Sequence, residues 1–193
     1  MLIYKKLNIL KGRYDVMQMI VPHLWFDKEA KEAALYYTNL FDNSRILYTH
    51  KIENPEPYDD AEVVVFELAG IRFGAISAGP YFKLNPASSL VVYCEKDEEY
   101  DRILAGLLNG GSIGDSEDVI TDRFGLTWRV ELVGNHEMRE KIIPWLLVSN
   151  AHLALEYYSS IFENIPDLNL ILQENTTEYE LTEAFSLIIN CKD

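Results

Sequence analysis

The chain has few cysteines and few positive charges. Its 193 residues include two cysteines, and 17 Lys and Arg against 31 Asp and Glu give a formal net charge of −14. Cys94 and Cys191 are far apart in the sequence, so a disulfide framework is not expected and a reducing compartment fits better. Nucleic-acid binding depends on clustered Lys and Arg, which release counterions from the phosphates. The charge therefore argues against a nucleic-acid partner.

Long apolar runs are also lacking. No run approaches the length that a bilayer-spanning helix needs, and the N-terminus has no signal-type apolar segment followed by small residues. We therefore predict a cytoplasmic protein that does not bind membranes. A hydrophobic content of 48% is enough for a packed core.

Motifs typical of catalytic sites are scarce as well. No pattern indicates a Ser-His-Asp or Cys-His nucleophile, and the histidines do not have the spacing of metal ligands. The four histidines are His23, His50, His136 and His152. The sequence therefore identifies no catalytic residue.

What the chain does contain is an internal repeat. The segment Ile20 to Asn43 returns near the other end as Ile142 to Asn164, and each copy consists of an apolar strand, a short polar link and a helix. The aligned positions are Pro22 with Pro144, Tyr36-Tyr37 with Tyr157-Tyr158, and Phe41 with Phe162. A repeat of this length predicts units that bury their apolar faces against one another.

The first unit is expected to have the order βαβββ. Strands are predicted at Ile20 to Phe26 and Arg45 to Ile52, with a helix at about Glu29 to Phe41 between them. Two more strands, in EVVVFELAGIRFGAIS, surround an Ala-Gly turn. Alternation places Leu24 and Phe26 on one face of the first strand and His23 and Trp25 on the other.

The same order recurs twice more. In the second unit we predict a strand at Ser88 to Cys94, a helix at Asp97 to Leu108 and two strands around a DRFG turn. In the third unit we predict a strand at Ile142 to Val148, a helix at Ala151 to Phe162 and a strand at Ala184 to Asn190. The chain then contains about two and three-quarter units.

Four separated stretches carry a resemblance to a known family. They are PHLWFDKEAKEAALYYTNLF, VVFELAGIRFGAISAGPYF, NPASSLVVYC and DRFGLTW. In this order they resemble the PhnB-like family, also called the 3-demethylubiquinone-9 3-methyltransferase domain family, of the glyoxalase/bleomycin-resistance/dioxygenase superfamily. The resemblance covers about residues 19–133 and restarts at residue 142, as in tandem members.

The resemblance implies an α+β fold in which paired βαβββ modules form a curled mixed sheet around a cleft, commonly in homodimers. We expect a glyoxalase-like domain of two modules over residues 17–134 and an incomplete second domain over residues 142–193. Residues 1–16 have no clear period and are predicted to be an N-terminal extension, possible non-native sequence ahead of a start at Met17. The apolar faces of the third unit are expected to pack against the first domain or against another chain.

The resemblance also allows a test for a metal site. Metal-dependent relatives hold a divalent ion at four positions, which map here to Val21 or Pro22, Glu67, Ser89 and Arg129. Only Glu67 could ligate, and a guanidinium at a ligand position would repel the ion. We therefore predict no metal and no cofactor.

The candidate ligand-binding residues follow from these placements. They are His23, Trp25, Glu67, Phe73, Ser89 and Arg129. His23 could bind an anion or move a proton, or be a hydrogen-bonded strand residue. Glu67 could act as a general base or form a structural ion pair with Arg129 across the modules. Phe73 is interpreted as an aromatic residue of the core or the cleft wall.

Three functions remain open from the sequence. The leading one is a metal-free protein that binds a small organic molecule in its cleft. The second is an enzyme of the same superfamily, either a metal-dependent lyase or isomerase or the methyltransferase of the family name. Methyl transfer has no support from the residues, because the glycines of the first unit do not form a strand-to-helix cofactor loop. The third is an assembly module without a ligand.

Overall fold

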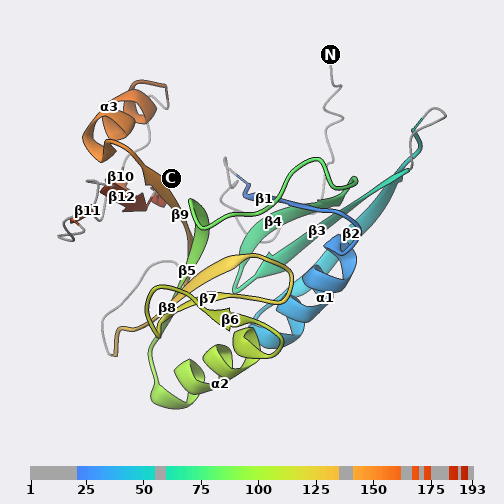
Figure 1. Cartoon of the computed structure of the whole chain (residues 1–193), viewed down its shortest axis with the longest axis horizontal. Coiled ribbons are helices and arrows are strands. Elements are labelled where there is room, and N and C mark those ends of the chain that lie inside the picture. The colour runs from blue at the N-terminus through green and yellow to red at the C-terminus, as the bar shows by residue number, and fades with distance from the viewer. Residues whose placement is uncertain are drawn as a thin grey trace, which may run out of the picture.

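In the first two units, helices and strands follow one another in the order that the repeat predicts (Figure 1). A computed structural model describes residues 21–54, 60–134, 141–161, 167–169, 172–174, 183–186 and 188–190. The first unit comprises β1 (His23–Phe26), α1 (Ala30–Leu40), β2 (Arg45–Ile52), β3 (Ala61–Leu68) and β4 (Ile71–Ser77). The second comprises β5 (Ser88–Cys94), α2 (Asp97–Leu108), β6 (Ser112–Ile113), β7 (Val119–Thr121) and β8 (Thr127–Leu132). The third comprises β9 (Ile142–Val148), α3 (Ala151–Ile161), β10 (Asp167–Asn169), β11 (Leu172–Glu174), β12 (Glu183–Ser186) and β13 (Ile188–Asn190).

The strands form two mixed sheets and a short separate pair. The first unit is a four-stranded sheet of order β1-β4-β3-β2, and β10 pairs with β13. The other sheet has seven strands in the order β11-β12-β9-β5-β8-β7-β6. In both complete units the first strand lies parallel to the last, β1 to β4 and β5 to β8. The predicted α+β class with repeated βαβββ units is confirmed.

Helix α1 covers one face of the first sheet. Its small residues allow close approach to the strands, and Ala30, Ala33 and Ala34 are fully buried. The hydroxyl oxygen of Ser77, at the end of β4, accepts a hydrogen bond from the Ala30 amide at 3.0 Å. That contact satisfies an amide at the start of the helix that has no intrahelical partner.

The first two units share one core on the side of their helices. The ring of Phe41, just after α1, stacks on Trp128 of β8 at 5.3 Å, and both side chains are buried. The Tyr36 hydroxyl donates to the Gly106 carbonyl of α2 at 2.6 Å. The units therefore pack through their helical sides, and the opposite face of each sheet points away from this core. The strands of the first unit and those of the second belong to different sheets, one of four and one of seven strands.

A buried carboxylate ties the two units together. The Asp122 side chain, 4% exposed, accepts hydrogen bonds from the Tyr37 hydroxyl at 2.7 Å and from the Trp128 indole at 2.8 Å. Its other oxygen accepts from the amides of Phe124 and Leu126. Burial raises the pKa of Asp122, although these four donors oppose the rise.

Strand β9 joins the third unit to the second. It pairs antiparallel with β5, and its Ile142 side chain is fully buried in the shared core. On the other face of the sheet, Ile143 and Trp145 form a second buried cluster with Val91 and Tyr93 of β5. The third unit thus packs against the first domain of the same chain, one of the two arrangements expected from its apolar faces.

The end of the third unit departs from the repeat. The sequence predicts one strand from Ala184 to Asn190, but the structure contains β12 and β13 there, in different sheets. Moreover, β12 runs antiparallel to β9, whereas β4 and β8 run parallel to the first strands of their units. The expected seven-residue strand is therefore wrong in this structure.

Within the described ranges, no helix is both long and apolar enough to cross a membrane.

Candidate functional site

The residues proposed from the sequence lie on two different sheets. His23, Trp25 and Glu67 lie on the face of the four-stranded sheet opposite α1, because their strand neighbours pack into the core. Ser89 and Arg129 lie on the face of the seven-stranded sheet opposite α2. The residues on each sheet therefore lie on one face of that sheet, but the two sets of residues do not form a common site.

Phe73 belongs to neither face. It is fully buried in the shared core, where its ring stacks on Phe66 at 5.7 Å. The sequence allowed Phe73 to lie either in the core or in the cleft wall, and the structure places it in the core.

Trp25 closes one end of the face opposite α1. Its indole donates to the Gly79 carbonyl at 2.9 Å, and its ring meets Phe82 edge-on at 4.8 Å. Phe82 and the neighbouring Tyr81 are 65% and 70% exposed. This end of the sheet thus presents aromatic surface to the solvent.

His23 lies directly over a glycine. It is opposite Gly74 in the β1–β4 pairing, and a β-carbon added to Gly74 would lie 2.4 Å from Cδ2 of the imidazole. That distance is far below van der Waals contact, so the absence of a side chain at Gly74 allows the ring to rest on the sheet.

Gly74→Ala is therefore expected to displace the His23 ring. Because the ring is exposed and can rotate, we expect a stability loss of no more than about 1 kcal/mol, the lower end for overpacking. The displacement is measurable as a shift of the His23 imidazole resonances, with His50 as the internal reference. Unchanged His23 resonances would contradict the contact.

The predicted ion pair between Glu67 and Arg129 does not form. Glu67 pairs with Arg45 of β2 at 2.8 Å, and Arg129 pairs with Asp118 at 3.1 Å. The reason is topological, since β3 and β8 belong to different sheets whose faces opposite the helices point away from the shared core. Each charge has found a partner on its own sheet.

A group of polar and aromatic side chains surrounds Arg129. We call it the Arg129 face, and its members are Ser89, Tyr93, Asp118, Arg129, Glu131 and Trp145. The Arg129 guanidinium lies 5.4 Å from the centre of the Trp145 ring, close enough for a cation–π attraction. The side chains of Arg129 and Asp118 are 29% and 35% exposed, so the pair is accessible but partly desolvated.

Two acids on the Arg129 face have raised pKa values. Burial, followed by the charge of Glu131, raises the pKa of Tyr93 to about 12. Burial also raises the pKa of Glu131, although the Arg129 charge opposes the rise. A carboxyl group of raised pKa beside a partly exposed guanidinium can exchange a proton with a bound molecule.

The sequence revealed only part of this face. Ser89 and Arg129 were identified through their positions in the resemblance, whereas Tyr93 was interpreted only as an aromatic residue of the core or the cleft wall, and Glu131 and Trp145 were not proposed. Alternation would place Tyr93 and Glu131 with the first two, since each lies on the same strand an even number of residues away. The position of Trp145 depends on the pairing of β9 with β5, which no local pattern indicates.

The residues at the mapped metal positions do not fit a divalent ion. Pro22 and Glu67 lie on or beside one sheet and Ser89 and Arg129 on the other, and both charged side chains are held in ion pairs. Over the part of the chain that the structure describes, no three His, Cys, Asp or Glu side chains come together as possible ligands.

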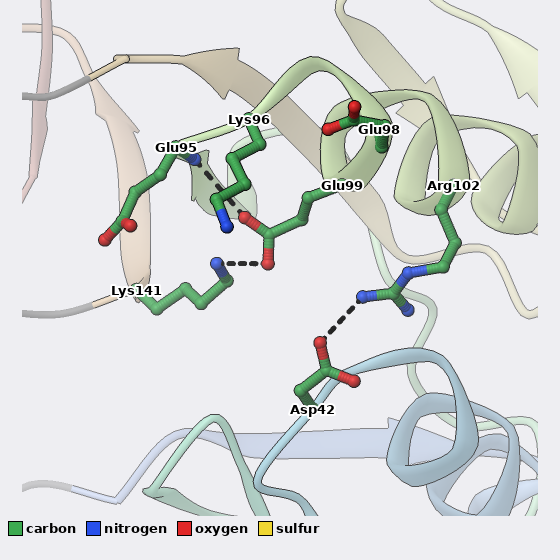
Figure 2. Close-up of a pocket in the computed structure, with 7 residues that line it drawn as sticks. All are labelled: Asp42, Glu95, Lys96, Glu98, Glu99, Arg102 and Lys141. Carbon is green, nitrogen blue, oxygen red and sulfur yellow. Dashed lines mark hydrogen bonds and ion pairs between the residues drawn. The ribbon is translucent and has the colours of Figure 1, made fainter.

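A charged hollow of about 430 Å³ lies elsewhere, where all three units meet (Figure 2). Its lining residues are Asp42, Glu95, Lys96, Glu98, Glu99, Arg102 and Lys141. Lys141, just before β9, pairs with Glu99 of α2 at 2.5 Å, and Arg102 of α2 pairs with Asp42 after α1 at 3.0 Å.

The contacts in this hollow indicate a structural role. Burial raises the pKa of Glu99, but the hydrogen bonds from Lys141 and from the Glu95 amide together outweigh it and lower the pKa. Arg102 and Lys141 thus already have partners from neighbouring units. The acidic first turn of α2, with Asp97 and Glu98, would also repel an anion from the helix N-terminus.

With this geometry in place, the chain can be compared with known proteins. A model of the 3-demethylubiquinone-9 3-methyltransferase family matches residues 18–131, more than half of the chain. The chain therefore belongs to this PhnB-like family, and its fold is that of the glyoxalase/bleomycin-resistance superfamily. No curated protein matches the chain.

The chain is also similar to several solved structures. The PhnB protein of Bacillus cereus is 30% identical, with a TM-score of 0.54 over 60% of this chain and 100% of that one. Protein PA1353 of Pseudomonas aeruginosa is 22% identical, with a TM-score of 0.46 over 62% of this chain and 100% of that one. The genomically encoded fosfomycin resistance protein FosX of Listeria monocytogenes is 14% identical, with a TM-score of 0.42 over 65% and 95%.

Proposed function

We propose that this protein binds a small organic molecule on the Arg129 face. The observation that carries the proposal is the Arg129 guanidinium, which is held by Asp118, lies beside the Trp145 ring and is only partly exposed. A guanidinium has five N–H donors, and the hydrogen bond to Asp118 uses one of them. The remaining donors suit a carboxylate or carbonyl oxygen of a ligand.

The surroundings of Arg129 favour a ligand with an apolar or aromatic part. Binding sites for small molecules combine apolar walls with a few placed polar groups. Here the Trp145 ring lies beside the guanidinium, and Ser89 and Glu131 supply polar groups on the same face. We therefore expect a small organic acid or carbonyl compound with a ring or short hydrocarbon portion.

A thermal-shift screen of such compounds tests the proposal. A ligand present at a hundred times its Kd stabilises the folded state by about 2.7 kcal/mol, which for a chain of this size raises the melting temperature by roughly 5–10 °C. Arg129→Met should then weaken the binding of each hit at least about tenfold, or about 1.4 kcal/mol, measured by calorimetry.

Arg102→Met is the matched control for that experiment. Arg102 is an arginine in an ion pair with an aspartate, as Arg129 is, but it lines the charged hollow rather than the Arg129 face. Its replacement should leave binding unchanged. Hits that bind Arg129→Met as well as the unaltered protein would refute the Arg129 face as the site.

An acid–base enzyme on the same face is a second candidate. The position of Glu131 beside Arg129 and opposite Tyr93 in the β5–β8 register supports it, because burial raises the pKa of this carboxyl group and so favours its protonated form. Glu131→Gln would separate the two functions. If the protein is an enzyme, the Glu131→Gln variant should still bind a hit but no longer turn it over. If it is a binding protein, the unaltered protein should show no turnover of the hit either.

A further inference from the structure

One guanidinium and two carboxyl groups lie together on the Arg129 face. The Asp118 carboxylate accepts a hydrogen bond from the Arg129 guanidinium at 3.1 Å. Glu131 lies two residues after Arg129 on β8, so both side chains project from the same face of the sheet, with Cα atoms about 6.5 Å apart. One small molecule bound at Arg129 can therefore also reach the carboxyl group of Glu131.

The neighbouring strands of this sheet bring no further cation to the Arg129 face. Strands β5, β7 and β9 contain no Lys, Arg or His. Lys141, directly before β9, pairs instead with Glu99 of α2 at 2.5 Å. Within the described ranges no hydrogen bond or ion pair neutralises Glu131, whereas Asp118 already neutralises Arg129. A further anion bound here would therefore lack a compensating charge.

We propose that the Arg129 face selects a neutral carboxamide over a carboxylate of the same shape, with Asp118 and Glu131 as the residues that determine this specificity. The inference rests on the proposed binding of a small molecule at Arg129. The carbonyl oxygen of an amide accepts from the guanidinium, and its N–H group donates to a carboxyl oxygen of Glu131 or Asp118. A carboxylate has no such donor and places a third negative charge beside a single guanidinium, which disfavours it.

The ionisation of the neighbouring groups supports this selection. Burial raises the pKa of Glu131, and of the two nearby charges Arg129 lowers this pKa while Asp118 raises it further. Burial and then the charge of Glu131 raise the pKa of Tyr93, which lies opposite Glu131 in the β5–β8 register, to about 12. These surroundings favour the neutral form of an acid, and an acid that belongs to a ligand meets the same surroundings.

The Trp145 ring indicates a suitable pair of probes. Its centre lies 5.4 Å from the Arg129 guanidinium, so a molecule held by Arg129 can pack an aromatic ring against it. Phenylacetamide and phenylacetate each carry such a ring. They have the same shape, and they differ in charge and in the presence of an N–H donor.

Calorimetric titration of the full chain at neutral pH tests the selection. The Kd of phenylacetamide should be at least about tenfold lower than that of phenylacetate. Glu131→Gln and Asp118→Asn each remove one carboxyl group and should reduce this preference at least about threefold, chiefly through tighter binding of phenylacetate. Asp42→Asn is the matched control, because it removes an aspartate from an ion pair with Arg102 and changes the net charge equally. It should leave the preference unchanged.

Arg129→Met separates this inference from the proposed function, since it should weaken the binding of both probes. Equal Kd values for the two probes, each raised by Arg129→Met, would overturn the selection and leave the proposed function standing. A preference that neither Glu131→Gln nor Asp118→Asn reduces would do the same, with the thermal midpoint of each variant showing that it is folded. Binding that Arg129→Met does not weaken would refute both. If phenylacetamide does not bind at millimolar concentration, the selection is overturned, whereas Arg129-dependent hits of the thermal-shift screen would retain the proposed function.

Discussion

Asp122→Ala is expected to lower the unfolding free energy by roughly 4 kcal/mol. The substitution removes an acceptor from four donors, and two of them, the Tyr37 hydroxyl and the Trp128 indole, belong to side chains that are fully buried. Each buried donor left without an acceptor costs about 1–3 kcal/mol, partly offset because a carboxylate of raised pKa no longer has to be buried. The measurement is chemical denaturation at neutral pH.

Tyr37→Phe provides the matched comparison. It removes the same hydroxyl hydrogen bond to Asp122 from the other side and keeps the buried ring, so a loss of about 1 kcal/mol is expected. When Tyr37→Phe is already present, Asp122→Ala should lower the unfolding free energy by less than it does in the unaltered protein. The reason is that the Tyr37 hydroxyl, one of the donors that Asp122→Ala leaves without an acceptor, is then absent. Additive losses would show that the Tyr37–Asp122 contact does not contribute to joining the two units.

Local structure was largely predictable from the sequence. The bounds of β2, β5, α2 and β9 agree with those expected, because each has a clear period and ends at polar residues or glycine. The turn at Ala69 and Gly70 was also predicted, and both residues have positive φ. The two-residue strand β6 was missed, since a segment of that length has no period to detect.

The pairing of units was not predictable from local pattern. The repeat indicated apolar faces that must be covered, but it does not specify which unit covers which. The predicted pairing of Glu67 with Arg129 across the two units is wrong, because their strands belong to different sheets. In the structure those units join through Tyr36, Phe41 and Trp128 on their helical sides, and β9 rather than β1 pairs with β5.

The candidate site was predictable only where it depends on strand alternation. His23, Trp25, Glu67, Ser89 and Arg129 lie on the strand faces expected of them. The ion-pair partners of the two charges could not be inferred, because Asp118 precedes β7 in the loop after β6, and the Arg45 pairing depends on the β2–β3 register. Charged side chains pair with whatever the tertiary structure places beside them.

Removing β9 is expected to destabilise the first two units severely. A chain ended after Glu140 loses three buried side chains, those of Ile142, Ile143 and Trp145, which are at most 6% exposed. At about 2 kcal/mol for each buried apolar side chain, the loss is roughly 6 kcal/mol, comparable to the whole stability of many domains. It also uncovers the edge of β5 and the buried side chains of Val91 and Tyr93.

A chain ended after Ser149 is the matched control, because it keeps β9 and lacks α3 and everything that follows. We expect this longer chain to remain folded, with a cooperative thermal transition, and the shorter one to melt at least about 10 °C lower or to aggregate through the exposed β5 edge. Circular dichroism and light scattering of the two chains decide the matter. Equal melting temperatures would show that residues 21–134 are stable without β9, and that its pairing with β5 is not needed to complete their fold.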